Sequence, residues 1–167
     1  MGAQFERGRV FLPELVLASK AMQEGVRVLK TQWKNMDRER KILGRVVLGT
    51  VKGDMHSIGK QILGSLLGAA GFEFFDLGED ISEEVFVEKV KLMKPDILGL
   101  SALLTTSMPH QAYVMNALKE AGIRQMIKVL VGGAPTTEEW AREIGADDWA
   151  PNAVLAVEQA KKVLKVG

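Results

Sequence analysis

The residues best suited to chemistry lie in one short segment, from Gly53 to Lys60. Its histidine, His56, follows a carboxylate, Asp54, by two residues. A histidine that binds a metal through one ring nitrogen commonly donates its other N–H to a carboxylate, which fixes the tautomer. A single histidine cannot hold a bare ion, but it can be an axial ligand to a metal that a macrocycle already holds. The alternative, an ordinary surface or packed histidine, is the commoner state of a lone histidine.

The composition excludes several other kinds of site. The 167 residues include 22 basic and 21 acidic side chains, two histidines and no cysteine. Without cysteine there is no disulfide, thiolate zinc site, cysteine-ligated iron–sulfur cluster or cysteine nucleophile. A net charge of +1 gives no electrostatic footprint for nucleic acid or for an anionic membrane. No apolar run reaches the length of a bilayer span and no signal peptide is recognisable, so we expect a cytoplasmic protein.

Two further segments place small and hydroxyl side chains where chemistry could occur. Residues 101–107 mix serine, threonine and leucine, and Gly132 and Gly133 remove two side chains where a flat or bulky group could enter. Each segment has a plainer interpretation. The hydroxyls of the first could cap a helix before Pro109, and the glycine pair could form an ordinary turn between a strand and a helix. Neither segment is specific when taken alone.

The elements that position these segments alternate between strands and helices. Short apolar runs predict five strands, at 45–51, 72–77, 95–101, 127–133 and near 148–149. Amphipathic stretches predict intervening helices at 58–70, from Ser82 onward, 108–121, from a capping box at Thr136 and Glu139, and 153–164. This order predicts an α/β fold with a doubly wound five-stranded parallel sheet, of the flavodoxin-like or Rossmann type. In such a sheet, ligands bind beyond the carboxyl ends of the strands, where the three segments lie.

The N-terminal part follows a different pattern. An amphipathic helix is predicted from Pro13 to Asn35, with its apolar stripe at Leu15, Ala18, Met22, Val26, Leu29 and Trp33. A polar linker over residues 34–41 follows it. We therefore divide the chain into residues 1–40, a helical remnant with its linker, and residues 41–167, the α/β domain. Because one helix cannot bury its own stripe, we expect self-association or a partner protein to cover it.

Taken together, the three segments resemble a known family. The loop from Gly53 to Lys60 resembles the Asp-x-His-x-x-Gly signature of cobalamin-binding domains, and Ser101-x-Leu103 and Gly132-Gly133 resemble that family's next two motifs, in the same order. The leading segment, residues 5–15, is similar to the last part of the helical cap in cobalamin-dependent methionine synthase and in corrinoid proteins of methyltransferase systems. The resemblance covers essentially the whole chain.

The resemblance implies a role for each matching residue. His56 would be the metal ligand, the lower axial ligand to the cobalt of cobalamin (vitamin B12), in its methylcobalamin and cob(I)alamin forms. Asp54 would hydrogen-bond the imidazole and Ser107 would extend that relay, so these three would be the catalytic residues. Phe5 and Leu12 would cover the upper, methyl-bearing face. The cofactor contacts implied are Gly53, Asp54, Met55, His56, Ser57, Ile58, Gly59, Ser101, Leu103, Thr105, Gly132, Gly133, Ala153, Phe5 and Leu12.

The chain departs from the family pattern in two places. Position 57 is serine where many members have aspartate, which removes a charge beside the cobalt ligand and leaves a residue able to cap the following helix. The cap is also reduced to its final loop and helix, so we expect either a truncated form or an unusually short member.

The resemblance implies a corrinoid protein that carries a methyl group on cobalt. A substrate-specific methyltransferase would load the group, and a pterin or thiol methyltransferase would accept it. The chain would be a carrier subunit of a methyltransferase system, not a complete enzyme, with homo-oligomerisation as a further option. The alternatives are the cobalamin domain of an adenosylcobalamin-dependent mutase, a cobalamin sensor, or a flavodoxin-like module without cobalamin. The cap remnant weighs against the mutase, and the absence of a DNA-binding module weighs against the sensor.

Overall fold

The computed structural model describes residues 42–166 throughout, together with residues 9–11, 13, 14, 17, 18, 20, 21, 24, 25 and 28. The chain divides into two compact units, residues 1–41 and residues 42–167. In the first unit, the described residues from Pro13 to Val28 are helical. Phe5 and Leu12 lie outside the described residues, and so do most of the predicted stripe positions, namely Leu15, Met22, Val26, Leu29 and Trp33.

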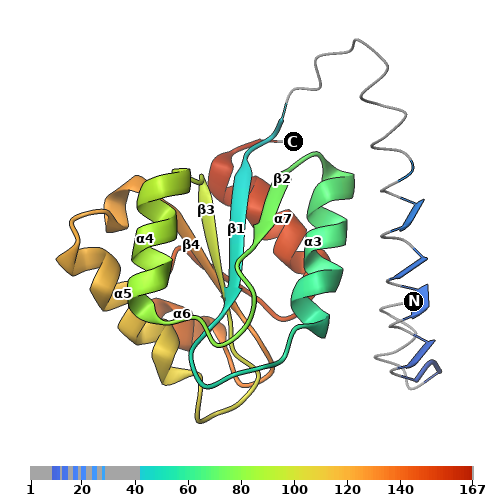
Figure 1. Ribbon diagram of the computed structural model, residues 1–167, viewed down its shortest axis with the longest axis horizontal. Helices are drawn as coiled ribbons and strands as arrows, with labels where there is room; N and C mark the ends of the chain where they lie inside the picture. The colour runs from blue at the N-terminus through green and yellow to red at the C-terminus, as the bar shows by residue number, and fades with distance from the viewer. Residues whose placement is uncertain are drawn as a thin grey trace. The chain divides into compact units, whose positions relative to one another are not determined.

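The second unit is built on a five-stranded parallel sheet (Figure 1). Its strands are β1 (Arg45–Thr50), β2 (Glu73–Asp76), β3 (Ile97–Ser101), β4 (Lys128–Gly132) and β5 (Asp148–Ala150). Their spatial order is β2-β1-β3-β4-β5, and every neighbouring pair is parallel. The direction of winding therefore reverses between β1 and β3, which is the switch point at which such sheets bind ligands. The predicted α/β fold with a five-stranded parallel sheet is confirmed.

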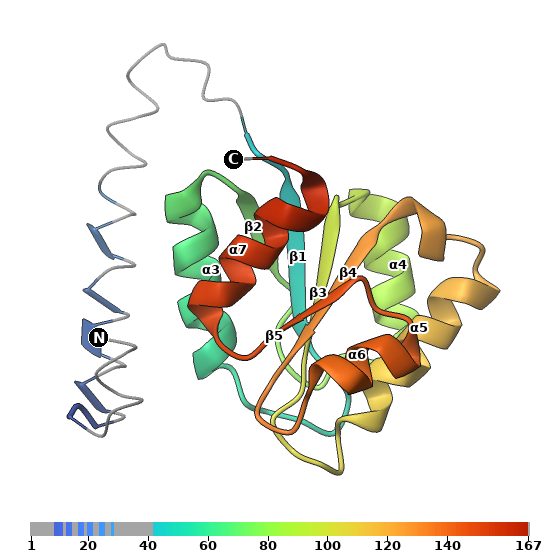
Figure 2. The same ribbon diagram turned by 180° about the vertical axis from the view of Figure 1, so that it is seen from behind.

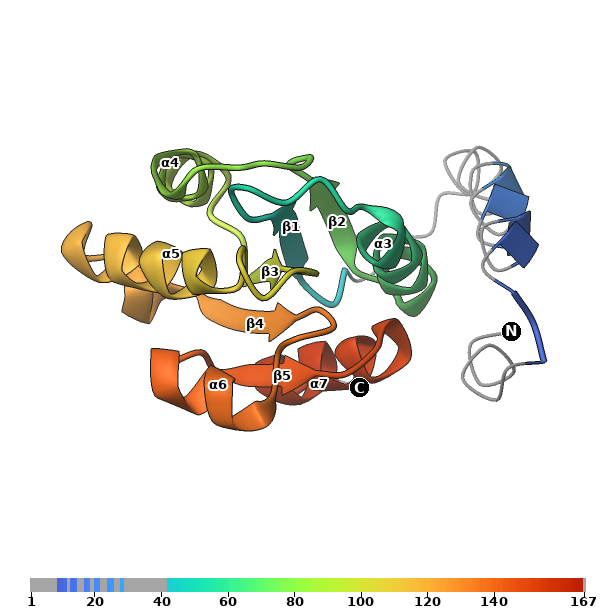
Figure 3. The same cartoon turned by 90° about the horizontal axis from the view of Figure 1, so that it is seen from below.

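Helices cover both faces of this sheet. They are α3 (Ile58–Ala70), α4 (Glu83–Met93), α5 (Pro109–Glu120), α6 (Glu138–Ile144) and α7 (Ala153–Leu164), with a 3₁₀ turn, η1, at Arg124–Met126. Helices α3 and α7 pack side by side on one face (Figure 2). Helices α4, α5 and α6 share the hydrophobic cluster on the other face, and the view along the sheet in Figure 3 separates the two layers. None of the helices in the described part of the chain is long and apolar enough to cross a membrane.

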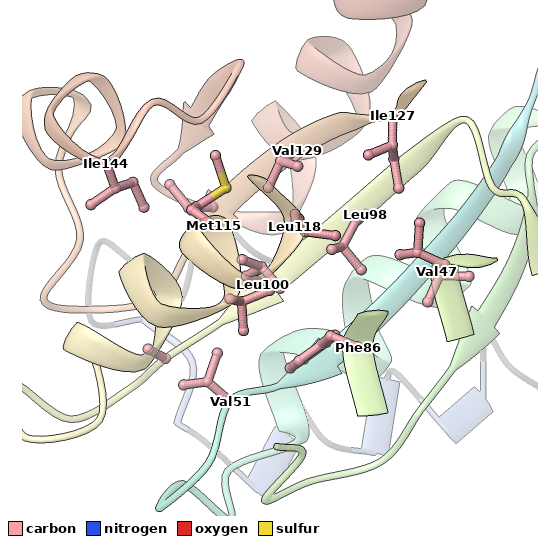
Figure 4. Close-up of a cluster of buried hydrophobic side chains, with 14 of the residues drawn as sticks. Val47, Val51, Phe86, Leu98, Leu100, Met115, Leu118, Ile127, Val129 and Ile144 are labelled. Carbon is pink, nitrogen blue, oxygen red and sulfur yellow. The ribbon is translucent and has the colours of Figure 1, made fainter. Parts of the chain in front are cut away.

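The alternation of side chains along β1 supplies both layers of the core. Val46 and Leu48 belong to the cluster beneath α3 and α7, whereas Val47 and Val51 belong to the cluster beneath α4, α5 and α6. The second cluster is centred on the fully buried Phe86 and on apolar residues of α5, β3 and β4 (Figure 4). Because both faces are buried, the strands read as continuous apolar runs, as the sequence indicated.

One helix begins differently from the prediction. The N-cap of α6 is Thr137, whose side chain accepts a hydrogen bond from the Trp140 backbone N–H at 3.1 Å, and not Thr136. The hydroxyl of Thr136 is engaged elsewhere, since it donates to the Gly133 carbonyl at 2.6 Å and accepts from Trp149 Nε1 at 2.9 Å. Only Thr136 has a glutamate three residues later, but both threonines suit an N-cap, and tertiary contacts decide between them.

Candidate functional site

The carboxylate of Asp54 joins the loops that follow β1 and β3. Its Oδ1 lies 2.8 Å from His56 Nδ1 and accepts the His56 backbone N–H at 3.0 Å. Its Oδ2 accepts the Ser107 hydroxyl at 2.7 Å and the backbone N–H of Leu103 at 2.7 Å. These are the two loops at the switch point of the sheet, so one carboxylate fixes their relative positions.

Asp54 is held as an anion. Its side chain has no exposed surface, and burial alone would raise its pKa. The hydrogen bonds from Ser107, from the Leu103 N–H and from His56 outweigh burial and hold the pKa of Asp54 well below its ordinary value of 3.8. A charged acceptor therefore faces Nδ1 of the imidazole at neutral pH and keeps a proton on that nitrogen.

His56 is oriented but accessible. Its side chain is 51% exposed, although its partner Asp54 is fully buried. Because Nδ1 is bound to Asp54, the ring presents Nε2 outward, and Nε2 has no hydrogen-bond partner among the described residues. A neutral imidazole with a proton on Nδ1 has its lone pair on Nε2, which is the form that binds a metal.

The rest of the site suits a metal that arrives inside a large ring. No group of three or more His, Cys, Asp or Glu side chains that could hold a metal ion exists within the described ranges. Large apolar side chains on the two loops and at the start of α3 are exposed, namely Met55, Ile58, Leu103 and Leu104. Exposed apolar surface around a single outward imidazole fits the face of a macrocycle, and the residues present therefore fit a corrinoid.

The remaining predicted contacts line up across the carboxyl edge of the sheet. Thr50 of β1 is the register partner of Ser101 in β3, which is in turn the partner of Gly132 in β4. Gly132 pairs with Ala150 at the end of β5, shortly before Ala153 opens α7. The topology thus brings the predicted residues of four separate segments to a single edge.

The predicted glycines differ in the reason for their small size. A Cβ atom built on Gly59 meets nothing within 4 Å, so this glycine leaves open space above the first turn of α3. Gly133 has a φ of +126°, and a Cβ there would lie 1.7 Å from the Ala102 carbonyl oxygen. Backbone packing alone therefore accounts for Gly133, whereas it does not account for Gly59.

Two hydroxyl residues of the site occupy positions that the sequence only partly indicated. Ser57 is the N-cap of α3, as expected, but its side chain makes no capping hydrogen bond and instead accepts from Gln61 Nε2 at 3.1 Å. Thr105 is exposed on the loop after β3. In the described part of the chain, neither hydroxyl makes a hydrogen bond to the His56 ring.

Sequence reasoning missed three buried polar side chains around the site. Thr50 donates its hydroxyl to the His56 carbonyl at 3.0 Å. Lys60 is buried, and its Nζ lies 2.6 Å from Asp76 Oδ1 in the segment after β2. Gln111 has no exposed surface and donates to the Leu100 and Gly132 carbonyls, at the ends of β3 and β4. The sequence shows that these residues lie next to the motif loops. It does not show their hydrogen-bond and ion-pair partners, because those are brought close only by the fold.

The second histidine is more constrained than expected. The sequence predicts a solvated His110 at the start of α5, whereas the structure places its Nδ1 2.5 Å from Glu83 Oε1 and its ring edge-on to Tyr113. The prediction was wrong because α4 and α5 begin side by side, which places an acidic first turn next to the histidine. No hydrogen bond connects His110 to Asp54 or His56 in the described part of the chain.

Comparison with protein-family models finds two matches. The family described as B12 binding domain matches residues 44–158, and a second family model with the same description matches residues 1–30. The first match spans the whole sheet and every predicted contact from Gly53 to Ala153. The second coincides with the N-terminal segment whose cap-like pattern the sequence indicated.

Individual relatives agree with these matches. The chain is 46% identical to trimethylamine corrinoid protein 2 of Methanosarcina mazei over 167 residues, which are 100% of this chain and 77% of that protein. It is 47% identical to dimethylamine corrinoid protein 3 of the same organism, over 98% of both chains. Among solved structures, the methanol:cobalamin methyltransferase complex of Methanosarcina barkeri aligns with a TM-score of 0.76 at 31% identity, over 98% of this chain and 61% of that one.

Proposed function

The chain belongs to the B12-binding family, as a corrinoid protein of a methyltransferase system, and we propose that His56 is the lower axial ligand of its cobalt. When bound, the corrinoid supplies a cobalt atom that carries a methyl group between two methyltransferases. The mutase and sensor alternatives are not favoured, because the relatives at 46–47% identity are corrinoid proteins named for methylamines. The observation that supports the proposal for His56 is the 2.8 Å contact between Nδ1 and buried Asp54, while Nε2 has no hydrogen-bond partner in the described part of the chain.

Asp54 and Ser107 hold the imidazole in its metal-binding form. The proton on Nδ1 is shared with an anionic oxygen that cannot move, because its carboxylate accepts four hydrogen bonds at 3.0 Å or less. The Ser107 hydroxyl, on the loop after β3, donates a hydrogen bond to the same carboxylate. It therefore connects that loop to the imidazole through Asp54.

The surrounding residues receive the rest of the cofactor. We assign the open space above Gly59 and the edge formed by Ser101, Gly132 and Ala153 to the nucleotide tail. The exposed Leu103 and its neighbours would support the ring itself. Phe5 and Leu12, which lie outside the described residues, retain their proposed role over the opposite face of the ring. Residues 1–40 would thus act as a cap, and residues 41–167 as the cofactor domain.

We further propose that the methyl donor is a methylamine and that the acceptor enzyme methylates a pterin or a thiol. The donor class follows from the trimethylamine and dimethylamine relatives, and a methyltransferase partner is supported by the methanol:cobalamin methyltransferase complex. The test is to reduce the cobalamin-loaded protein to its cob(I)alamin form with a chemical reductant, and then to mix it with separate methyltransferases for trimethylamine, dimethylamine, monomethylamine and methanol, each with its substrate. Spectral conversion of the corrinoid with one of the methylamine enzymes is expected. Conversion with the methanol enzyme alone would contradict the proposed donor.

A further inference from the structure

We propose that Thr50 is a positioning residue, whose hydroxyl fixes the peptide of His56 and thereby the direction of the imidazole. This inference rests on the proposed role of His56 as the axial ligand. Thr50 is the last residue of β1 and has no exposed surface. Its Oγ1 donates a hydrogen bond to the His56 carbonyl at 3.0 Å, across the turn formed by residues 51–55.

Thr50 is a rigid point of attachment. Its backbone N–H donates to the Gly78 carbonyl at 3.1 Å, and its own carbonyl accepts the Ile81 N–H at 3.0 Å. On the other side, Thr50 is in parallel register with Ser101 of β3. The hydroxyl therefore projects from a strand that is bonded on both edges. These backbone bonds do not depend on the side chain, so the hydroxyl can be removed without removing a bond of the sheet.

The buried Lys60 strengthens this attachment. Its ammonium group lies 2.6 Å from Asp76 Oδ1 and 3.4 Å from Glu79 Oε1, and it donates to the Gly78 carbonyl at 2.5 Å. The Gly78 carbonyl is the same one that accepts the Thr50 N–H. Lys60 thereby connects the first turn of α3 to the segment after β2. That segment in turn is hydrogen-bonded to Thr50 at the end of β1.

The His56 carbonyl needs a donor from outside the helix. The bond that opens α3 runs from the Gln61 N–H to the Ser57 carbonyl at 2.9 Å, so the His56 carbonyl lies one residue before the helical ladder. The His56 N–H is bound to Asp54 Oδ1 at 3.0 Å. Asp54 and Thr50 therefore hold the two polar groups of the His56 backbone from opposite sides. Loss of the Thr50 bond would free the 56–57 peptide to rotate and carry the ring with it.

Thr50→Val and Thr50→Ser test the inference, each in the full chain beside wild type and His56→Ala. Valine keeps the branched shape of threonine without the hydroxyl, and serine keeps the hydroxyl. Each protein is incubated with hydroxocobalamin and desalted, and both the bound corrinoid per chain and the axial-ligand bands of the visible spectrum are measured. Because one hydrogen bond is lost, Thr50→Val is expected to lower the ratio of histidine-bound to histidine-free corrinoid roughly three- to tenfold. Thr50→Ser is expected to stay within about twofold of wild type on the same reasoning.

The inference would be overturned if folded Thr50→Val had the same ratio of histidine-bound to histidine-free corrinoid as wild type. Urea unfolding of each variant establishes that it is folded, and Thr50→Ala replaces the valine variant if the latter is not. A cofactor-free readout accompanies the spectra: the ring resonances of His56 in the NMR spectrum are expected to broaden in the variant without the hydroxyl. His56→Ala separates the two proposals, because identical spectra for wild type and His56→Ala would refute His56 as the ligand, whatever Thr50 does.

Discussion

At the scale of single residues, Asp54 connects an exposed ring to a buried network. Its two oxygens are directed to different loops, Oδ1 to His56 and Oδ2 to Leu103 and Ser107. Charge and geometry at Nδ1 are therefore set by a buried carboxylate and by the groups of a second loop that donate hydrogen bonds to it. Mutation of a carboxylate that hydrogen-bonds a metal-binding histidine typically lowers metal affinity or activity by about 10- to 100-fold.

Asp54→Asn and Ser107→Ala should consequently have unequal effects. Asp54→Asn removes the charge that holds the proton on Nδ1, and we expect the fraction of histidine-bound corrinoid to fall by about 10-fold or more. Ser107→Ala removes one of several donors to Asp54 Oδ2, so a reduction of roughly two- to fivefold is expected. Visible spectra of the corrinoid-loaded variants measure both. Equal losses, or a larger loss for Ser107→Ala, would show that the charge of Asp54 is not what holds the ring.

The sequence indicated these residues because their spacing is local. Asp54 and His56 are two residues apart, and their contact could be predicted from the loop alone. The contact of Ser107 with Asp54 spans 53 positions, and it was indicated only by the resemblance to the family. Neither the Leu103 N–H nor the Thr50 hydroxyl could be foreseen, because a backbone donor leaves no mark in the sequence and a threonine at the end of a strand fits its β-branched pattern equally well.

At the scale of elements, the two kinds of glycine predict opposite outcomes of the same change. In Gly133→Ala, the new methyl group overlaps the Ala102 carbonyl and the backbone has a φ of +126°, so we expect a loss of about 3 kcal/mol or more in the free energy of unfolding. In Gly59→Ala, the methyl group enters open space within the first turn of α3, so the stability should be unchanged or slightly higher.

Urea unfolding distinguishes these glycine variants, and corrinoid retention after desalting adds a second comparison. Gly59→Ala is expected to fold normally and retain less cobalamin, because its methyl group would occupy space assigned to the nucleotide tail. If Gly59→Ala retains as much cobalamin as wild type, the nucleotide tail does not occupy the space above Gly59. Stability of Gly133→Ala close to that of wild type would contradict the close approach of the loops after β3 and β4.

Asp147 makes the region around β4 and β5 sensitive to acid. Burial would raise its pKa, but hydrogen bonds from Lys128, the Val129 N–H and Arg124 outweigh burial and lower the pKa below its ordinary value of 3.8. A carboxyl group with a lowered pKa stabilises the fold above the unfolded-state pKa, and this contribution disappears as the pH falls through the folded-state pKa. The contribution of Asp147 is therefore complete at neutral pH and is lost at strongly acidic pH.

Asp147→Asn should therefore lower the free energy of unfolding by roughly 1–3 kcal/mol at pH 7, since charge-assisted hydrogen bonds are lost. The difference from wild type should shrink as the pH falls below the ordinary carboxyl pKa of 3.8, where Asp147 of the unfolded chain begins to be protonated, and vanish as the pH falls through the lower folded-state pKa. Chemical unfolding across this pH range provides the measurement. Glu88→Gln is the control, because the pairing of exposed Glu88 within the described residues is with its neighbour Lys89 on the surface, and its loss should change stability little. A difference independent of pH would show that the loss comes from packing, not from charge.

The sequence predicted every strand and every α-helix of the second unit, but not the 3₁₀ turn η1, and its other errors lie at element ends. Continuous apolar runs identify strands buried on both faces, so β1, β3 and β4 were unambiguous. The start of α6 was displaced by one residue because Thr136 and Thr137 both suit an N-cap. His110 was misjudged because its acidic partner is on α4, 27 positions earlier in the chain. Local patterns therefore gave the elements, whereas contacts between elements decided the details.

At the scale of the whole molecule, the two hydrophobic clusters of the second unit are formed by residues between Leu43 and Val166. Most of the apolar stripe predicted for the N-terminal helix lies outside the described residues. We keep the prediction that this stripe is covered by self-association or by a methyltransferase. Size-exclusion chromatography with light scattering is expected to give a mass above 18.3 kDa that rises with concentration in the micromolar range. A strict monomer would contradict self-association and leave the methyltransferase as the partner.

The measurement that tests the central claim most directly is the visible spectrum of the desalted protein after incubation with hydroxocobalamin, beside that of His56→Ala. Because His56 presents Nε2 outward from an imidazole anchored on Asp54, the wild-type protein is expected to retain about one corrinoid per chain, with axial-ligand bands that shift in the variant. Retained corrinoid with identical bands in the two proteins would contradict His56 as the cobalt ligand, and a colourless wild-type protein would contradict the cofactor site itself.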